Sequence, residues 1–113
     1  MPQNRNKLID LFIGNISNAI VHEILERAVK KEELTEKYRK ELINSFEIAM
    51  KYREKINPLN KTLPVKDVNY IKTKINNKIK NELSIRISKG YQGIDLSLIE
   101  PLTNDALKKA VVL

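Results

Sequence analysis

The chain has 113 residues, of which 42% are hydrophobic and 31% charged, values typical of one folded domain with a modest core. It contains no cysteine, which excludes disulfides, thiolate zinc sites and cysteine nucleophiles. The net charge of +7 is uneven, because residues 51–89 carry eleven basic and three acidic side chains, a sum of +8. Such a local excess favours an anionic partner but does not bear on the fold.

A first helix is predicted from about Lys7 to about Lys31, with Asn4 or Asn6 able to cap it. Apolar residues recur at helical spacing along one face, at Ile9, Phe12, Ile13, Ile16, Ile20 and Ile24. The second half of this helix adds another apolar surface, formed by Val21, Leu25, Ala28 and Val29. Gly14 indicates either a close approach of another helix or a mild kink, with nothing in the sequence to separate the two.

A second helix is expected to run to about Ile56, with Thr35 as its cap, and to end at Asn57-Pro58 because the residue before proline avoids helical geometry. Its apolar face comprises Tyr38, Leu42, Phe46, Ala49 and Ile56. Leu59 and Leu63, in the connection that follows, are expected to fold back onto the end of the bundle.

The segment from Lys66 to Lys89 carries the clearest pattern. Its apolar residues are spaced by three and four positions, at Val68, Ile71, Ile75, Ile79 and Leu83. Asp67 suits the start of this third helix, and Gly90 suits a left-handed stop after its end.

After Gly90, Asp95 can cap a short helical turn through Glu100, which Pro101 is expected to stop. A last short helix is predicted over Asp105–Val112, capped by Thr103 or Asn104. The fold class is therefore all-α, with residues 1–113 as a single domain. Three long antiparallel helices plus a short helical C-terminal segment make a three- to four-helix bundle.

Several polar residues stand out against these helices. His22 falls on the polar side of the first helix and is expected to be exposed. Glu23 and Arg27, like Glu82 and Arg86, have the favoured i,i+4 spacing, and parallel first and third helices would bring both pairs to one end. They predict a partly buried interhelical ion-pair layer, with a small anion pocket as the alternative.

The basic residues of the third helix and its approach are candidates for binding nucleic acid or another anion: Lys66, Lys72, Lys74, Lys78, Lys80 and Arg53. The lysines spread around the helix, and Tyr52 and Tyr70 are the only aromatic residues among them, which weakens this reading. A solvated helix face explains the same pattern.

The second apolar surface of the first helix needs a cover, because large exposed apolar patches are rare on monomers. The C-terminal residues Leu107, Val111, Val112 and Leu113 could cover it from the same chain, and a two-fold partner chain could cover it equally well. A homodimer is predicted through Val21, Leu25, Val29, Leu107 and Val111. We found no catalytic, metal or cofactor motif, no signal peptide and no apolar segment approaching membrane-spanning length. We therefore expect a cytoplasmic, non-catalytic protein that acts by protein–protein contact and self-association; the alternative is nucleic-acid binding through residues 51–89.

Overall fold

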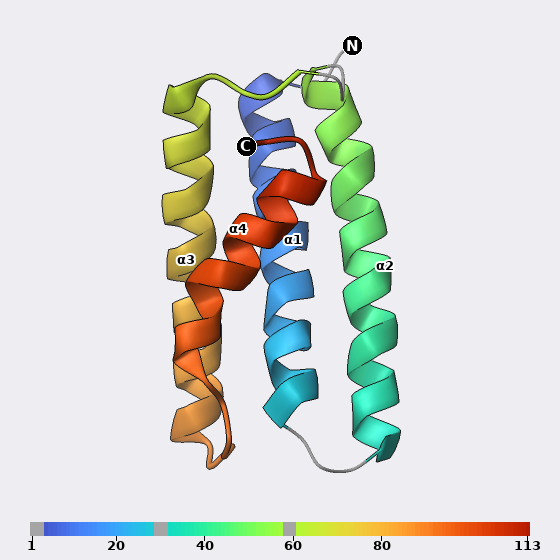
Figure 1. Ribbon diagram of the computed structural model, residues 1–113, viewed down its shortest axis with the longest axis vertical. Helices are drawn as coiled ribbons and strands as arrows, with labels where there is room; N and C mark the ends of the chain where they lie inside the picture. Colours follow the sequence, from blue (N-terminus) through green and yellow to red (C-terminus); the bar gives the residue numbers. More distant parts are fainter. Residues whose placement is uncertain (1–3, 29–31, 58–60) are drawn as a thin grey trace.

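The computed structural model describes residues 4–28, 32–57 and 61–113, and the prediction of an all-α bundle is confirmed. Three long helices alternate in direction, so that the first and third run parallel, while a shorter fourth helix crosses them obliquely (Figure 1). The molecule measures 42 × 24 × 24 Å. Its elements are α1 (Arg5–Ala28), α2 (Glu32–Ile56), α3 (Val65–Ser88), the 3-10 turn η1 (Leu96–Leu98) and α4 (Ile99–Lys109).

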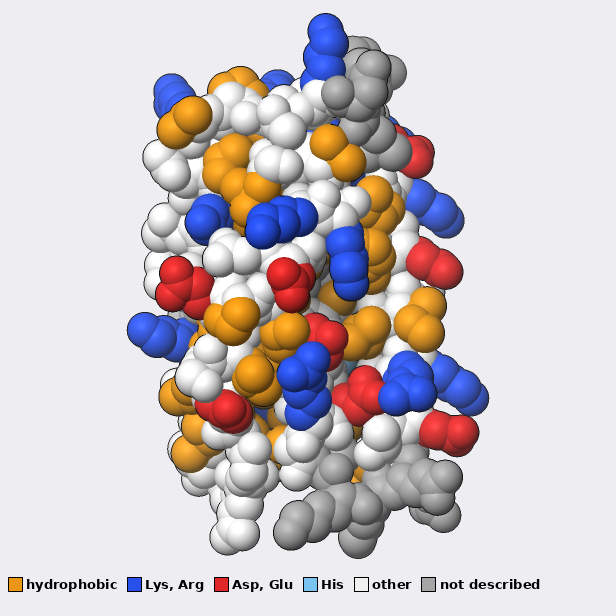
Figure 2. Space-filling view, viewed as in Figure 1, with side chains coloured by type: hydrophobic (Ala, Val, Ile, Leu, Met, Phe, Trp, Pro, Cys, Tyr) orange, Lys and Arg blue, Asp and Glu red, His pale blue; other side chains and the backbone are white. Residues whose placement is uncertain are grey.

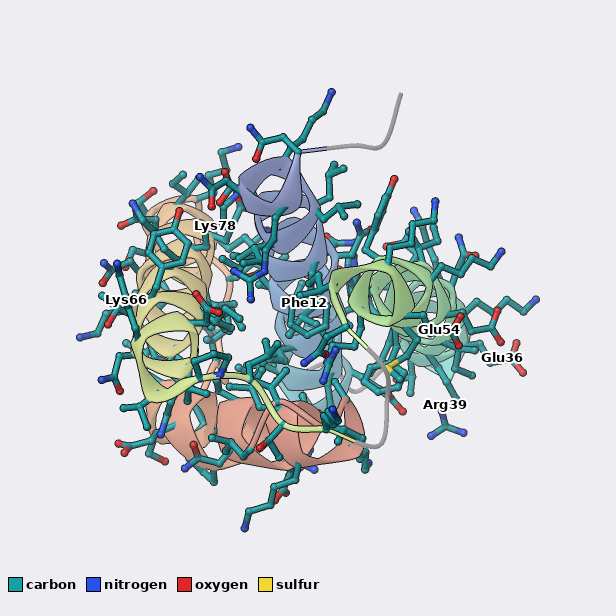
Figure 3. All side chains as sticks on the ribbon, turned by 90° about the horizontal axis from the view of Figure 1, so that it is seen from above. Phe12, Glu36, Arg39, Glu54, Lys66 and Lys78 are labelled. Atoms are coloured by element: carbon teal, nitrogen blue, oxygen red, sulfur yellow. The ribbon has the colours of Figure 1, made fainter. Side chains whose placement is uncertain are left out.

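Helix α1 is the centre of the bundle. It packs against α2, α3 and α4, and α4 also packs against α3. Both apolar surfaces of α1 are therefore covered within one chain, since Val21 and Leu25 are as deeply buried as Ile16 and Ile24. Phe12 is fully buried and points into the space enclosed by the helices (Figure 3).

The central position of α1 explains its composition. Its 24 residues are long and apolar enough to cross a membrane, which corrects the expectation that no segment approaches that length. Of its most apolar stretch, 67% is buried inside the bundle. A helix buried in a protein core can be as long and as apolar as one that crosses a membrane. The composition of α1 is thus accounted for by packing.

The helix ends confirm some expected signals and correct others. The backbone N–H of Asn6 donates to the Asn4 side chain at 2.8 Å, so Asn4 caps α1. Gly90 follows α3 with a φ of +98°, the predicted left-handed stop. The expected cap of the second helix was wrong, because α2 already begins at Glu32 and Thr35 lies inside it.

The C-terminal segment also differs from the prediction. Asp95 caps η1 by accepting from the Ser97 N–H at 3.0 Å, as expected. Pro101, however, lies in the first turn of α4 and does not end a helix, because the N–H groups of a first turn have no helical partner. Thr103 is consequently a buried residue of α4 and not its cap.

Two further expectations concern packing. Leu63 is buried on the end of the bundle as predicted, while Leu59 lies outside the described residues. A Cβ atom added at Gly14 would meet nothing within 4 Å, so Gly14 does not serve a close helix–helix approach.

Candidate functional site

A groove of about 480 Å³ runs between α2 and α4, with α1 as its floor. It exists because α4 is short and crosses the bundle obliquely, leaving part of the α1–α2 seam uncovered (Figure 1). Hydrophobic side chains gather in this part of the surface, with acidic and basic side chains around them (Figure 2). The apolar residues that line the groove are Ala19, Ile20, Leu42, Ile43, Phe46, Leu102 and Ala106.

Ile43 is the most exposed apolar residue of the groove, with 50% of its surface accessible. Phe46 and Leu42 beside it are only half-buried, although the expected apolar face of α2 included both. An isoleucine, a phenylalanine and a leucine left open side by side make a surface that apolar groups of another molecule can cover.

The charged rim of the groove carries both signs: Glu23, Arg27, Glu47, Asp105 and Lys109. Glu23 and Arg27 approach to 3.7 Å within α1, with the Arg27 side chain 53% exposed. On α3, Glu82 and Arg86 pair at 3.0 Å, with Glu82 57% exposed. Each predicted pair therefore forms within its own helix, with one partly buried member, Glu23 at 35% or Arg86 at 27% exposure. Among the described residues neither pair bridges α1 to α3, so the interhelical part of the predicted layer was wrong, whereas partial burial holds for Glu23 and Arg86.

Arg53 is the clearest correction among the predicted anion-binding residues. Its side chain is fully buried, and burial lowers its pKa from the ordinary value. The guanidinium donates to the carbonyl oxygens of Ala110 at 2.8 Å, Val111 at 2.6 Å and Lys61 at 2.8 Å, and also to Asn57. All its donors face oxygens of the chain, so Arg53 fastens the end of α4 to the end of α2 and is not available to an anion.

The lysines of α3 remain accessible, but they do not form one patch. Lys66, Lys74, Lys78 and Lys80 are exposed, and Lys72 is half-buried. Lys66 and Lys78 leave α3 on different sides (Figure 3), as the helical spacing predicted.

A smaller hollow of about 300 Å³ lies between α1 and α3, lined by Asp10, Ile13, Tyr70, Lys74 and Lys78. Tyr70 donates to Asp10 at 2.9 Å, a contact that raises the pKa of Tyr70. The ammonium of Lys74 lies 5.8 Å from the centre of the Tyr70 ring. A carboxylate in this hollow works against an anionic ligand.

His22 is buried at 8% exposure, and not exposed as predicted. Its Nδ1 lies 2.7 Å from the Asn18 carbonyl oxygen, its Nε2 contacts Glu41, and its ring lies 5.8 Å from the Tyr38 ring. Both ring nitrogens therefore lie beside oxygen atoms, one of α1 and one of α2. The prediction from the helical wheel of α1 missed this contact, because α2 covers the side of α1 that carries His22.

The residues predicted for a dimer interface belong mostly to the core. Val21, Leu25 and Leu107 are at most 2% exposed within one chain, and Val111 is half-buried. Val29 lies outside the described residues. Val21, Leu25 and Leu107 are already covered by the chain's own helices, so the prediction was wrong for these three residues.

In the part of the chain that the structure describes, no group of three or more His, Cys, Asp or Glu side chains is placed to hold a metal ion. No protein-family model matches the chain, and no curated protein or solved structure matches it either.

Proposed function

We propose that this protein is non-catalytic and acts by binding proteins, its own copies included, through the groove between α2 and α4. The observation that carries the proposal is the open apolar lining around Ile43, half of whose surface is accessible. Protein interfaces combine an apolar centre with a polar rim, and this groove has both.

A matched pair of variants tests the proposal. Ile43→Glu places a charge in the groove, whereas Ile85→Glu places one on α3 at the same exposure of 50% and outside the groove lining. Both proteins are used as bait in nuclease-treated lysate of the source cells. We expect Ile43→Glu to lose proteins that the unchanged chain and Ile85→Glu retain. Identical captured proteins for all three baits would contradict the proposal.

Nucleic-acid binding through residues 51–89 is the second candidate, supported by the exposure of Lys66, Lys74, Lys78 and Lys80. Arg53 no longer contributes to it, because its guanidinium is buried. Binding of this kind should weaken steeply with salt, each neutralised phosphate adding about 0.9 to the log–log slope. Replacing Lys74 and Lys78 by Gln should flatten that slope. The absence of any shift of DNA or RNA at low salt would exclude this candidate.

A further inference from the structure

Helix α4 forms one wall of the groove and keeps most of the apolar surface beside it covered. Ile20 and Leu102 line the groove but are only 2% and 8% exposed, whereas Ile43 on α2 is 50% exposed. Leu107, also on α4, is fully buried. A partner that enters the groove as it stands therefore meets apolar surface mainly on α2, and more would become available if α4 moved away.

The end of α4 is closed by a Schellman motif. The N–H of Val112 donates to the Leu107 carbonyl at 2.9 Å, and the N–H of Val111 donates to the Lys108 carbonyl at 3.1 Å. These two bonds define the motif, in which the residue in the left-handed conformation is usually a glycine. Here that residue is Val111, with a φ of +56°.

Helix α3 ends with the same motif and has the usual glycine. The N–H of Tyr91 donates to the Arg86 carbonyl at 3.1 Å, and the left-handed residue between them is Gly90. A β-branched residue is strained in the left-handed region, whereas glycine is not. The closed end of α4 therefore carries a backbone strain at Val111 that the end of α3 does not.

Arg53 holds this strained end against α2. Its guanidinium donates to the carbonyl oxygens of Ala110 at 2.8 Å and Val111 at 2.6 Å. Its other partners are oxygens of Lys61 and Asn57, and none of the ion pairs among the described residues includes Arg53. Burying a charge without a counter-charge costs free energy. Both this cost and the strain at Val111 are relieved when the end of α4 leaves α2 and water reaches Arg53.

We infer that α4 is a lid on the groove, which opens on its own while the three long helices stay packed. Its 11 residues compare with 24 or 25 in each long helix, so its departure exposes the least core. Opening uncovers Ile20, Leu102 and Leu107, so a partner binds the open form more tightly than the closed one. This inference rests on the proposed protein-binding role of the groove and names what controls access to it.

The absence of cysteine from the chain allows the lid to be followed with a single thiol. Thr103→Cys is a conservative change in α4, because Thr103 is 1% exposed and its hydroxyl has no hydrogen-bond partner among the described residues. Ser45→Cys is the control, since Ser45 is 6% exposed and its Oγ accepts from Asn18 at 2.6 Å, between α2 and α1. With excess iodoacetamide, Thr103→Cys should react about tenfold faster or more, with a weaker dependence on urea concentration. A reaction no faster than that of Ser45→Cys would overturn the inference, because α4 would then leave only when the whole bundle unfolds.

A second substitution tests the strain. Val111→Gly, combined with Thr103→Cys, should slow the thiol reaction about tenfold, because the closed lid is no longer strained at residue 111. Val111→Ala shortens the side chain but keeps a non-glycine residue in the left-handed conformation, so it should not slow the reaction. Equal rates with Val, Ala and Gly at this position would show that strain does not set the opening of the lid.

The role of the lid in binding is tested with Val111→Gly as bait in the lysate experiment described above. Position 111 does not line the groove, and an open population about tenfold smaller lowers the apparent affinity by the same factor. Capture should therefore need about tenfold more Val111→Gly bait than unchanged bait. Equal capture despite a slower thiol reaction would overturn the control of access by the lid. Identical captured proteins for Ile43→Glu and Ile85→Glu would instead reject the proposed binding role, and the thiol result would stand.

Discussion

Arg53 offers the sharpest test of how this bundle is held together. Replacing it by Met keeps an unbranched stem in place of the arginine methylene groups but removes every guanidinium donor. The carbonyl oxygens of Ala110 and Val111, which accept at 2.8 and 2.6 Å, then lose their donor beneath the end of α4. Lys61 is exposed, and Asn57 and Val111 are half-buried, so water can replace the guanidinium more readily at their oxygens than at the buried Ala110 carbonyl.

The magnitude follows from the Ala110 carbonyl, whose contact is buried, and the Val111 carbonyl, whose contact is half-buried. A buried acceptor left without a donor costs about 1–3 kcal/mol, so the two together set an upper range of about 2–6 kcal/mol. We expect Arg53→Met to lower the free energy of unfolding by about 2–4 kcal/mol, because Met leaves neutral acceptors unpaired but no unpaired buried charge. At about 0.05–0.15 kcal/mol per residue, 113 residues have a total stability of about 6–17 kcal/mol. The variant should remain folded but lose a large part of that stability.

Urea unfolding followed by far-UV circular dichroism measures this loss. Arg39→Met is the matched control, because Arg39 is 64% exposed and its pair with Glu26 contributes about 0–1 kcal/mol. Arg53→Lys should fall between the two variants, since a lysine keeps the charge but supplies its donors from a single point. Hydrogen exchange should accelerate most in α4, whose end Arg53 holds. If Arg53→Met unfolds at the same urea concentration as Arg39→Met, the reasoning is refuted.

Four further variants test other parts of the packing by the same unfolding measurement. Gly14→Ala should stabilise the protein by about 0.5–1 kcal/mol, because alanine loses less conformational entropy in a helix and the added methyl meets nothing within 4 Å. Gly90→Ala should destabilise the protein, because the φ of Gly90 is +98° and an alanine is strained there. His22→Ala should cost about 0.5–3 kcal/mol, since it removes a buried ring and its contact with Glu41 between α1 and α2, and an unchanged midpoint would contradict the buried contact. Leu25→Glu should unfold the monomer itself, because Leu25 is 1% exposed; a folded monomer with this change would show that the site is accessible.

The three long helices and their directions follow from the amino-acid sequence alone. The spacing of Ile71, Ile75, Ile79 and Leu83 predicts α3 within one residue of its observed bounds, Val65–Ser88. This succeeds because a helix buries one face, and its 3.6-residue period places that face at every third or fourth position. Gly90 and Asp95 act locally, through backbone conformation and a short-range hydrogen bond, so they too were read correctly.

Which face meets which neighbour was decided only by the tertiary structure. Helix periodicity assigns angles around one axis, but it does not say how many other helices surround that axis. The two apolar surfaces of α1 predicted a dimer interface, whereas α2, α3 and α4 cover Val21 and Leu25 from within the chain. His22 was placed on a polar side of α1 that α2 in fact covers.

Arg53 and Ile43 are two residues whose exposure to solvent helix periodicity does not predict. Arg53 is a charged residue that becomes buried, because carbonyl oxygens from α4 and the connection after α2 converge on it. Ile43 is an apolar residue that stays half exposed, because the oblique path of α4 leaves the groove beside it uncovered. Partners far apart in sequence, such as Arg53 and Ala110, meet only once the helices have packed. The periodicity of apolar residues along one helix therefore does not predict such contacts between distant segments.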